Sequence, residues 1–207
     1  FRQAIDKLSG LHYTEARQRE VELLAQEREA NHIKKRTRKT EQFFRLRPIV
    51  DYDAVFIPDE PTIAGQILPT FAYRDIDRIK FLGTSSWNSP DFISRAQSHA
   101  EQASFVDAFF ANNSSPQVLA FIEKYRSTYH QEPTSLEALA SDADHLLPEA
   151  ISSLSSSFSR YDMKERLKSI HDFQGVTGLI SFKQGQFYRN LTVLQVKRGA
   201  FVKASTD

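Results

Sequence analysis

The chain has 207 residues, of which 40% are hydrophobic and 12% aromatic, enough for a packed core in one or two domains and against general disorder. Its 27 basic and 26 acidic side chains leave a formal net charge of +1, so no overall field would direct it to nucleic acid or anionic lipid. The absence of cysteine excludes disulfides and thiolate chemistry and leaves only histidine and carboxylates as metal ligands.

The first forty residues predict helices that bury little surface. Phe1, Ile5 and Leu8 recur at helical spacing, and Gly10 follows as a terminator. Residues 14–40 are mostly Glu, Arg, Lys and Gln, with an acidic half followed by a basic cluster at 34–39. This pattern is typical of a charge-balanced surface helix or insertion. A contact of the basic cluster with a phosphate or an anionic polymer is the alternative.

Residues 51–83 carry the pattern of a β–α–β unit. Apolar runs at 54–57 and 81–82 flank a segment, residues 62–73, whose apolar side chains recur at helical spacing. Continuous apolar strands joined by a helical crossover predict a parallel sheet with right-handed connections. Binding pockets in such sheets lie beyond the carboxyl ends of the strands.

The loops that follow these two strands supply the candidate ligand-binding residues. We select these six positions: Asp59, Glu60, Thr84, Ser85, Trp87 and Asn88. Asp59 and Glu60 could accept hydrogen bonds from a ligand, although loop solvation or capping of the next helix by Glu60 explains them almost equally well. Trp87, the only tryptophan, could form an aromatic wall for a ligand or anchor the loop by packing. Both interpretations stay open at this point.

The second half of the chain predicts three more helices and a hairpin. Apolar stripes at 118–129 and 136–147 indicate amphipathic helices that cover a sheet. A further helix near 163–170 follows a capping box at 159–162, and the serine-rich stretch before it indicates a flexible connection. Gly175, Gly178 and Gly185 punctuate short apolar runs and predict a β-hairpin.

No pattern for catalysis or for a bound cofactor emerges. The three Asp-x-Asp pairs, at 51/53, 75/77 and 142/144, have no histidine or third carboxylate at useful spacing. The six histidines are scattered and form no H-x-x-x-H pair. A phosphate-binding glycine loop and a nucleophile elbow are also missing from the sequence. We therefore predict a non-enzymatic protein that binds no metal and needs no cofactor.

Several segments, taken in order, resemble one protein family. They are Asp-Ala-Val-Phe-Ile-Pro-Asp at 53–59, Ala-Gly-Gln-Ile-Leu at 64–68, Phe-Leu-Gly-Thr at 81–84, Ala-Ser-Asp-Ala at 140–143 and Phe-Gln-Gly-Val-Thr-Gly-Leu-Ile-Ser-Phe at 173–182. This order is similar to the carboxyl-terminal part of the Leu/Ile/Val-type periplasmic binding proteins, type I. The resemblance covers about residues 50–202 and leaves the charged helix at 14–40 unexplained.

The resemblance implies an α/β, parallel-sheet, two-lobed periplasmic-binding-protein-like fold that is incomplete at its N-terminal side. Residues 1–104 would form lobe two with a charged helical insertion near 14–40. Residues 105–172 would be returning lobe-one helices, and residues 173–207 a closing hairpin of lobe two. Because the sequence opens at Phe1 without a leader, we expect that an export signal and the first βα units of lobe one precede it.

The resemblance also implies a function. Family members are extracytoplasmic solute-binding receptors that clamp a small polar ligand between two lobes. Members that bind amino acids carry an acidic residue where this chain has Ser85, and a hydroxyl cannot replace a buried carboxylate as counter-ion. A plain branched amino acid is therefore disfavoured as the ligand.

The alternative is an envelope lipoprotein that regulates a peptidoglycan synthase, as penicillin-binding-protein activators do with a similar domain. In either case we expect a periplasmic or extracellular protein that contacts no nucleic acid. It would meet a membrane only through a lipid anchor outside this chain. Its partner would be a small polar ligand or another envelope protein.

Overall fold

The computed structural model describes residues 1–31, 45–152 and 157–204. The chain begins with two helices, α1 (Arg2–Leu8) and α2 (Gln18–Ala30). No residue of α2 is buried, which confirms a solvated helix up to residue 30. The basic cluster at 34–39 and the centre of the serine-rich connection lie outside the described residues.

A five-stranded mixed sheet forms the larger structural unit, with strand order β1-β2-β3-β7-β8. Its strands are β1 (Ala54–Phe56), β2 (Lys80–Gly83), β3 (Ser104–Asp107), β7 (Thr192–Lys197) and β8 (Ala200–Lys203). β1 pairs in parallel with β2, and Val55 lies opposite Phe81. β3 continues the parallel set, whereas β7 and β8 are antiparallel. The predicted β–α–β unit is confirmed.

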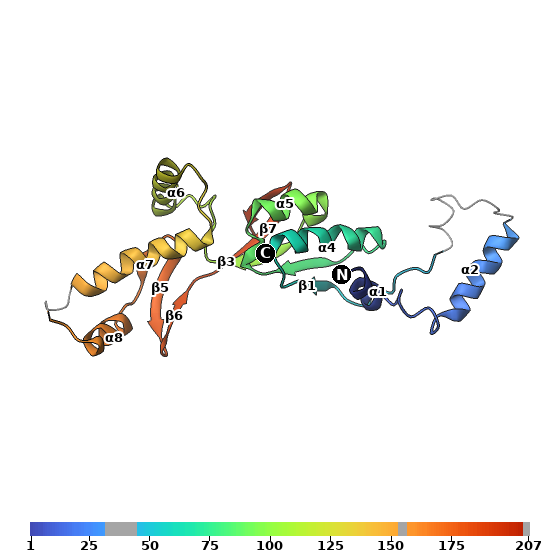
Figure 1. Cartoon of the computed structure of the whole chain (residues 1–207), viewed down its shortest axis with the longest axis horizontal. Coiled ribbons are helices and arrows are strands. Elements are labelled where there is room, and N and C mark those ends of the chain that lie inside the picture. The colour runs from blue at the N-terminus through green and yellow to red at the C-terminus, as the bar shows by residue number, and fades with distance from the viewer. Residues whose placement is uncertain (32–44, 153–156, 205–207) are drawn as a thin grey trace.

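Helices cover one face of this sheet (Figure 1). They are α4 (Pro61–Tyr73), α5 (Pro90–Ala96) and the 3₁₀ turns η1 (Ser85–Trp87) and η2 (Gln97–Ala100). α4 starts with proline at its first helical position, where the missing N–H costs nothing. Leu68 and Phe71 of α4 pack with Phe105 and Leu194 of the sheet in one core. The α1 helix joins this core through Ile5.

The opposite face of the five-stranded sheet exposes apolar side chains. Strand residues alternate between the two faces, so the neighbours of the buried residues point away from α4 and α5. Four of them, from four adjacent strands, are 39–59% exposed: Phe56, Leu82, Val106 and Val193. We call these four residues the bare sheet face.

A second unit contains an antiparallel sheet and three helices. The strands are β4 (Phe173–Gly175), β5 (Gly178–Lys183) and β6 (Gln186–Arg189), and the helices are α6 (Pro116–Tyr129), α7 (Ser135–Ser152) and α8 (Arg160–Lys168). Figure 1 shows this group set apart from the five-stranded unit. The predicted capping box is confirmed, because the Ser159 hydroxyl and the Asp162 carboxylate each accept from the other residue's backbone N–H.

The observed sheets correct the segment boundaries expected from the sequence. Residues 104–107 form a strand of the large sheet, whereas the resemblance implied that lobe-one helices begin at residue 105. Residues 173–189 form the small sheet, and only residues 192–203 return to the large one. The physical reason is packing: Ile180 and Phe173 complete an apolar cluster with Leu146 of α7 and Ile170. The chain therefore returns to the larger unit after β6.

Candidate ligand-binding site

The loops after β1 and β2 meet at one edge of the large sheet, as their parallel pairing requires. The Ser86 hydroxyl donates to the backbone carbonyl of Asp59 at 3.1 Å. The hydroxyls of Ser86 and Thr84 lie 2.8 Å apart and share a hydrogen bond. Ser85, next to them, is exposed. Asp59, Thr84 and Ser85 thus come together at the carboxyl ends of the strands, where the sequence placed them.

Two carboxylates border this edge. Asp59 is half-buried, and its Oδ1 atom accepts the backbone N–H of Glu60 at 2.8 Å. Glu60 occupies the N-cap position of α4, but its side chain makes no capping hydrogen bond. Its exposed carboxylate lies at the N-terminus of the helix. Both side chains therefore remain able to accept hydrogen bonds from a solute.

Trp87 does not line the surface. Of the two interpretations that the sequence left open, the structure supports a packing anchor for the loop and not an aromatic wall for a ligand. Its side chain is fully buried and stacks on Phe92 with ring centroids 4.4 Å apart. A Cβ atom on Gly83 would lie 2.2 Å from the indole ring, so the strand approaches the ring too closely for any other residue. Trp87 holds the site loop onto the core rather than facing a solute.

The side-chain amide of Asn88 forms hydrogen bonds within the protein. Its amide donates to Asp107 Oδ2 at 2.7 Å and to the carbonyl of Phe109 at 2.9 Å. Asp107 ends β3 and is only 3% exposed. Asp107 is not among the residues predicted from the sequence, because the sequence pattern did not predict a strand at residues 104–107. The rule applied to β1 and β2 would have selected it, since it occupies the carboxyl end of the third parallel strand.

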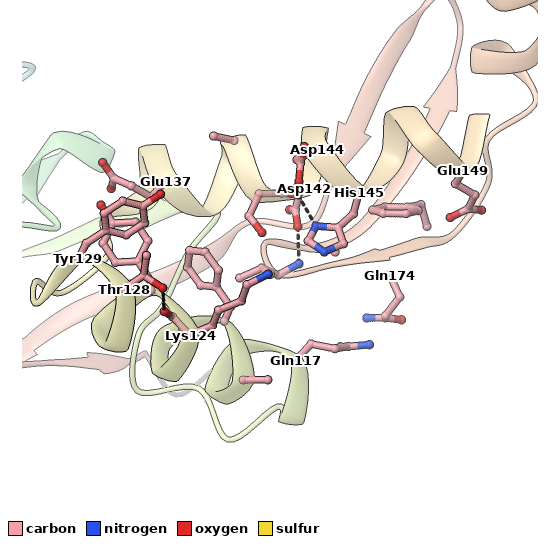
Figure 2. A pocket seen from close by; sticks show the side chains of 18 residues that line it. Gln117, Lys124, Thr128, Tyr129, Glu137, Asp142, Asp144, His145, Glu149 and Gln174 are labelled. Atoms are coloured by element: carbon pink, nitrogen blue, oxygen red, sulfur yellow. Dashed lines mark hydrogen bonds between the residues drawn. The ribbon is translucent and has the colours of Figure 1, made fainter. Parts of the chain in front are cut away.

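A separate hollow of about 920 Å³ lies between α6, α7 and β4. Figure 2 shows Lys124 extending from α6 toward α7, with Glu149 and Gln174 at the far end. Tyr125 also lines it, and burial raises the pKa of this phenol. None of the six candidate residues lines this hollow. The lining contains positively charged, negatively charged and tyrosine side chains together, so it selects no single class of ligand.

Of the Asp142/Asp144 pair, Asp142 has a structural role at the wall of this hollow. Asp142 is 2% exposed, and its carboxylate accepts the N–H groups of Val176 at 2.5 Å and Thr177 at 3.0 Å and the Thr177 hydroxyl. A Cβ atom on Gly175 would lie 2.7 Å from that carboxylate. The motifs at 140–143 and 173–182 are therefore partners: the aspartate of one fastens the glycine-flanked turn of the other.

Two searches of the described residues bear on chemistry and location. Within residues 1–31, 45–152 and 157–204, no three His, Asp or Glu side chains are grouped so as to hold a metal ion. No helix in that part of the chain is long and apolar enough to cross a membrane.

Comparison with known proteins identifies the family. The model of the periplasmic binding protein family matches residues 51–200, which is more than half of the chain. The chain therefore belongs to the periplasmic binding proteins, and the predicted α/β periplasmic-binding-protein-like fold is confirmed. No curated protein matches the chain.

Solved structures of solute-binding proteins are similar. The leucine-binding protein LivK of Thermotoga maritima aligns with a TM-score of 0.62 and 24% identity over 81% of this chain and 46% of its own length. LivJ of Streptococcus pneumoniae, in complex with isoleucine, aligns at 0.59 and 27% over 75% and 46%. An ABC transporter substrate-binding protein from Desulfitobacterium hafniense, in complex with leucine, aligns at 0.59 and 24% over 73% and 43%. The chain spans less than half the length of these relatives.

Proposed function

We propose that this chain is part of an extracytoplasmic solute-binding receptor of the ABC-transporter type, which clamps a small polar ligand between two lobes. The observation that carries the proposal is the meeting of the β1 and β2 loops, through Ser86 and Asp59, at one edge of the sheet. Asp107 ends β3 at the same edge and contacts Ser135 of the second unit. The edge therefore faces the second unit, as a clamp requires.

The two units correspond to the two lobes in this proposal. The five-stranded unit is lobe two, and the unit of α6, α7, α8 and β4–β6 is the returning part of lobe one. In this division the lobe boundaries differ from those expected from the sequence. They lie where the described chain crosses between the two units, after Asp107 and before Thr192.

The chemistry of the edge favours a solute with hydrogen-bond donors. Asp59, Glu60, Thr84 and Ser85 carry only carboxylates and hydroxyls, and an ammonium group is the natural partner of such a set. The Streptococcus and Desulfitobacterium relatives were solved with isoleucine and leucine, which supports an amine-bearing solute. The neutral Ser85 disfavoured a plain branched amino acid in the sequence, but Asp59 and Glu60 at the same edge are acidic groups that can receive the amine in place of that residue.

The remaining aspects of the proposal follow from the family. A periplasmic location and a non-enzymatic role are typical of periplasmic binding proteins. The relatives described above are solute-binding proteins, and this favours the receptor over the lipoprotein that regulates a peptidoglycan synthase. A lipid anchor and an envelope-protein partner remain predictions.

Asp59→Asn tests the proposal directly. Saturation-transfer NMR on the chain would compare leucine and isoleucine with their N-acetyl derivatives, which lack the ammonium group. We expect the free amino acids to bind better, and Asp59→Asn to weaken them about tenfold or more, because a hydrogen bond to a charged group contributes about 1.5–3 kcal/mol.

Asp77→Asn is the matched control, since Asp77 is exposed and precedes β2 at the opposite edge of the sheet. Equal binding of the acetylated compounds, or equal losses in the two variants, would contradict recognition of an amine at this edge.

A further inference from the structure

Asp107 joins the two units through a buried carboxylate. It ends β3, the last strand before the chain leaves the five-stranded unit, and it is 3% exposed. Its Oδ1 atom accepts the N–H of Ala108 at 2.6 Å and that of Phe109 at 3.4 Å. Each of these bonds holds the first residues of the crossing segment.

The Oδ2 atom of the same carboxylate binds one donor from each unit. Asn88 donates to it at 2.7 Å from the site loop that follows β2. Ser135 donates to it at 2.5 Å from the first turn of α7 in the second unit. Asn88 also donates to the carbonyl of Phe109, whose ring belongs to the core of the second unit. The site loop, the crossing segment and α7 therefore share one hydrogen-bonded centre.

This arrangement acts on two units that only two segments of the described chain connect. The described chain passes between the units only after β3 and before β7, and units joined in this way move relative to one another by default. A buried carboxylate is strongly destabilised when a donor is withdrawn, because it cannot regain water. Rotation of α7 away from the sheet would remove the Ser135 donor, so the carboxylate opposes that rotation.

We propose that Asp107 is the positioning residue of the hinge: its carboxylate fixes the angle between the site loop and α7 through Asn88 and Ser135. The proposal rests on the proposed function in one respect, because a clamp needs a defined angle between its walls. Asp107 acts through its two partners and needs no contact with a ligand.

The test measures the relation between the units without any ligand, so its failure is distinct from failure of the proposed binding. The chain contains no cysteine, and Gln66→Cys on α4 with Lys164→Cys on α8 gives one exposed spin-label site on each unit. Pulsed electron–electron double resonance then reports the distribution of distances between the units. We expect a single narrow distribution for the otherwise unchanged chain.

Ser135→Ala, which removes only the donor from α7, should broaden this distribution or add a second distance. Asp107→Asn should do the same, because its amide would meet the donating amide of Asn88. Ser127→Ala is the matched control: the Ser127 hydroxyl donates to Lys124 within α6 alone, and its loss should leave the distribution unchanged. Circular dichroism would establish that each variant is folded. A folded Ser135→Ala variant with the unchanged distribution would overturn the proposal.

Discussion

Replacement of Trp87 by alanine should damage the fold before it affects any solute. The indole is fully buried between Phe92 and Phe105. An aromatic side chain buries about 150–250 Å², which at about 25 cal/mol per Å² corresponds to about 4–6 kcal/mol. Alanine retains part of this burial, and aromatic-to-alanine changes in cores destabilise by about 3–5 kcal/mol. We expect Trp87→Ala to lie in that range.

Urea unfolding followed by circular dichroism measures this loss. In the unchanged chain, the single tryptophan should also emit at short wavelength and shift to longer wavelength on unfolding. Tyr73→Ala is the matched control, because this aromatic residue at the end of α4 is 59% exposed. It should change stability by no more than about 0.5 kcal/mol. A loss below about 1 kcal/mol for Trp87→Ala would refute the reasoning, since it would approach the effect of about 0.5 kcal/mol that is typical of exposed substitutions.

Three further predictions concern other parts of the chain. Gly175→Ala should lower the melting temperature, because the new Cβ would lie 2.7 Å from the Asp142 carboxylate and such overpacking costs about 1–3 kcal/mol; an unchanged melting temperature would show that the turn can shift freely. The hydrogen bond from Thr134 lowers the pKa of Glu137 below its usual 4.5. The stability that this hydrogen bond gives the folded state is therefore present above pH 4.5 and is lost as the pH falls through the lowered pKa. Glu137→Gln should therefore reduce the acid sensitivity of thermal unfolding, and an identical pH profile would contradict this. The bare sheet face should promote self-association of the chain. Phe56→Lys, at a side chain 59% exposed, should therefore lower the average mass measured by analytical ultracentrifugation. An equal mass would show that the chains associate through another surface.

Local pattern predicted most of the elements correctly. The apolar runs at β1 and β2 flank the helical pattern of α4, and this strand–helix–strand order predicts a parallel pair of strands. Both the hydrophobic period and the order of the elements can be read from neighbouring residues. The capping box at Ser159 is local in the same sense, since its two partners are three residues apart. The order of the motifs at 53–84 and 173–182 was enough to indicate the family, which the match over residues 51–200 confirms.

Contacts between distant residues decided the rest. Residues 104–107 and the three strands within residues 173–189 carry only short apolar runs. Packing determines that the first segment joins the large sheet while the second forms its own. Asp142 and Thr177 are 35 residues apart, and no local pattern pairs them. Trp87 could equally have faced a solute, because sequence shows that a side chain is apolar but not which core encloses it. Asp107 became a link between the units only once β3 placed it within reach of both Asn88 and Ser135.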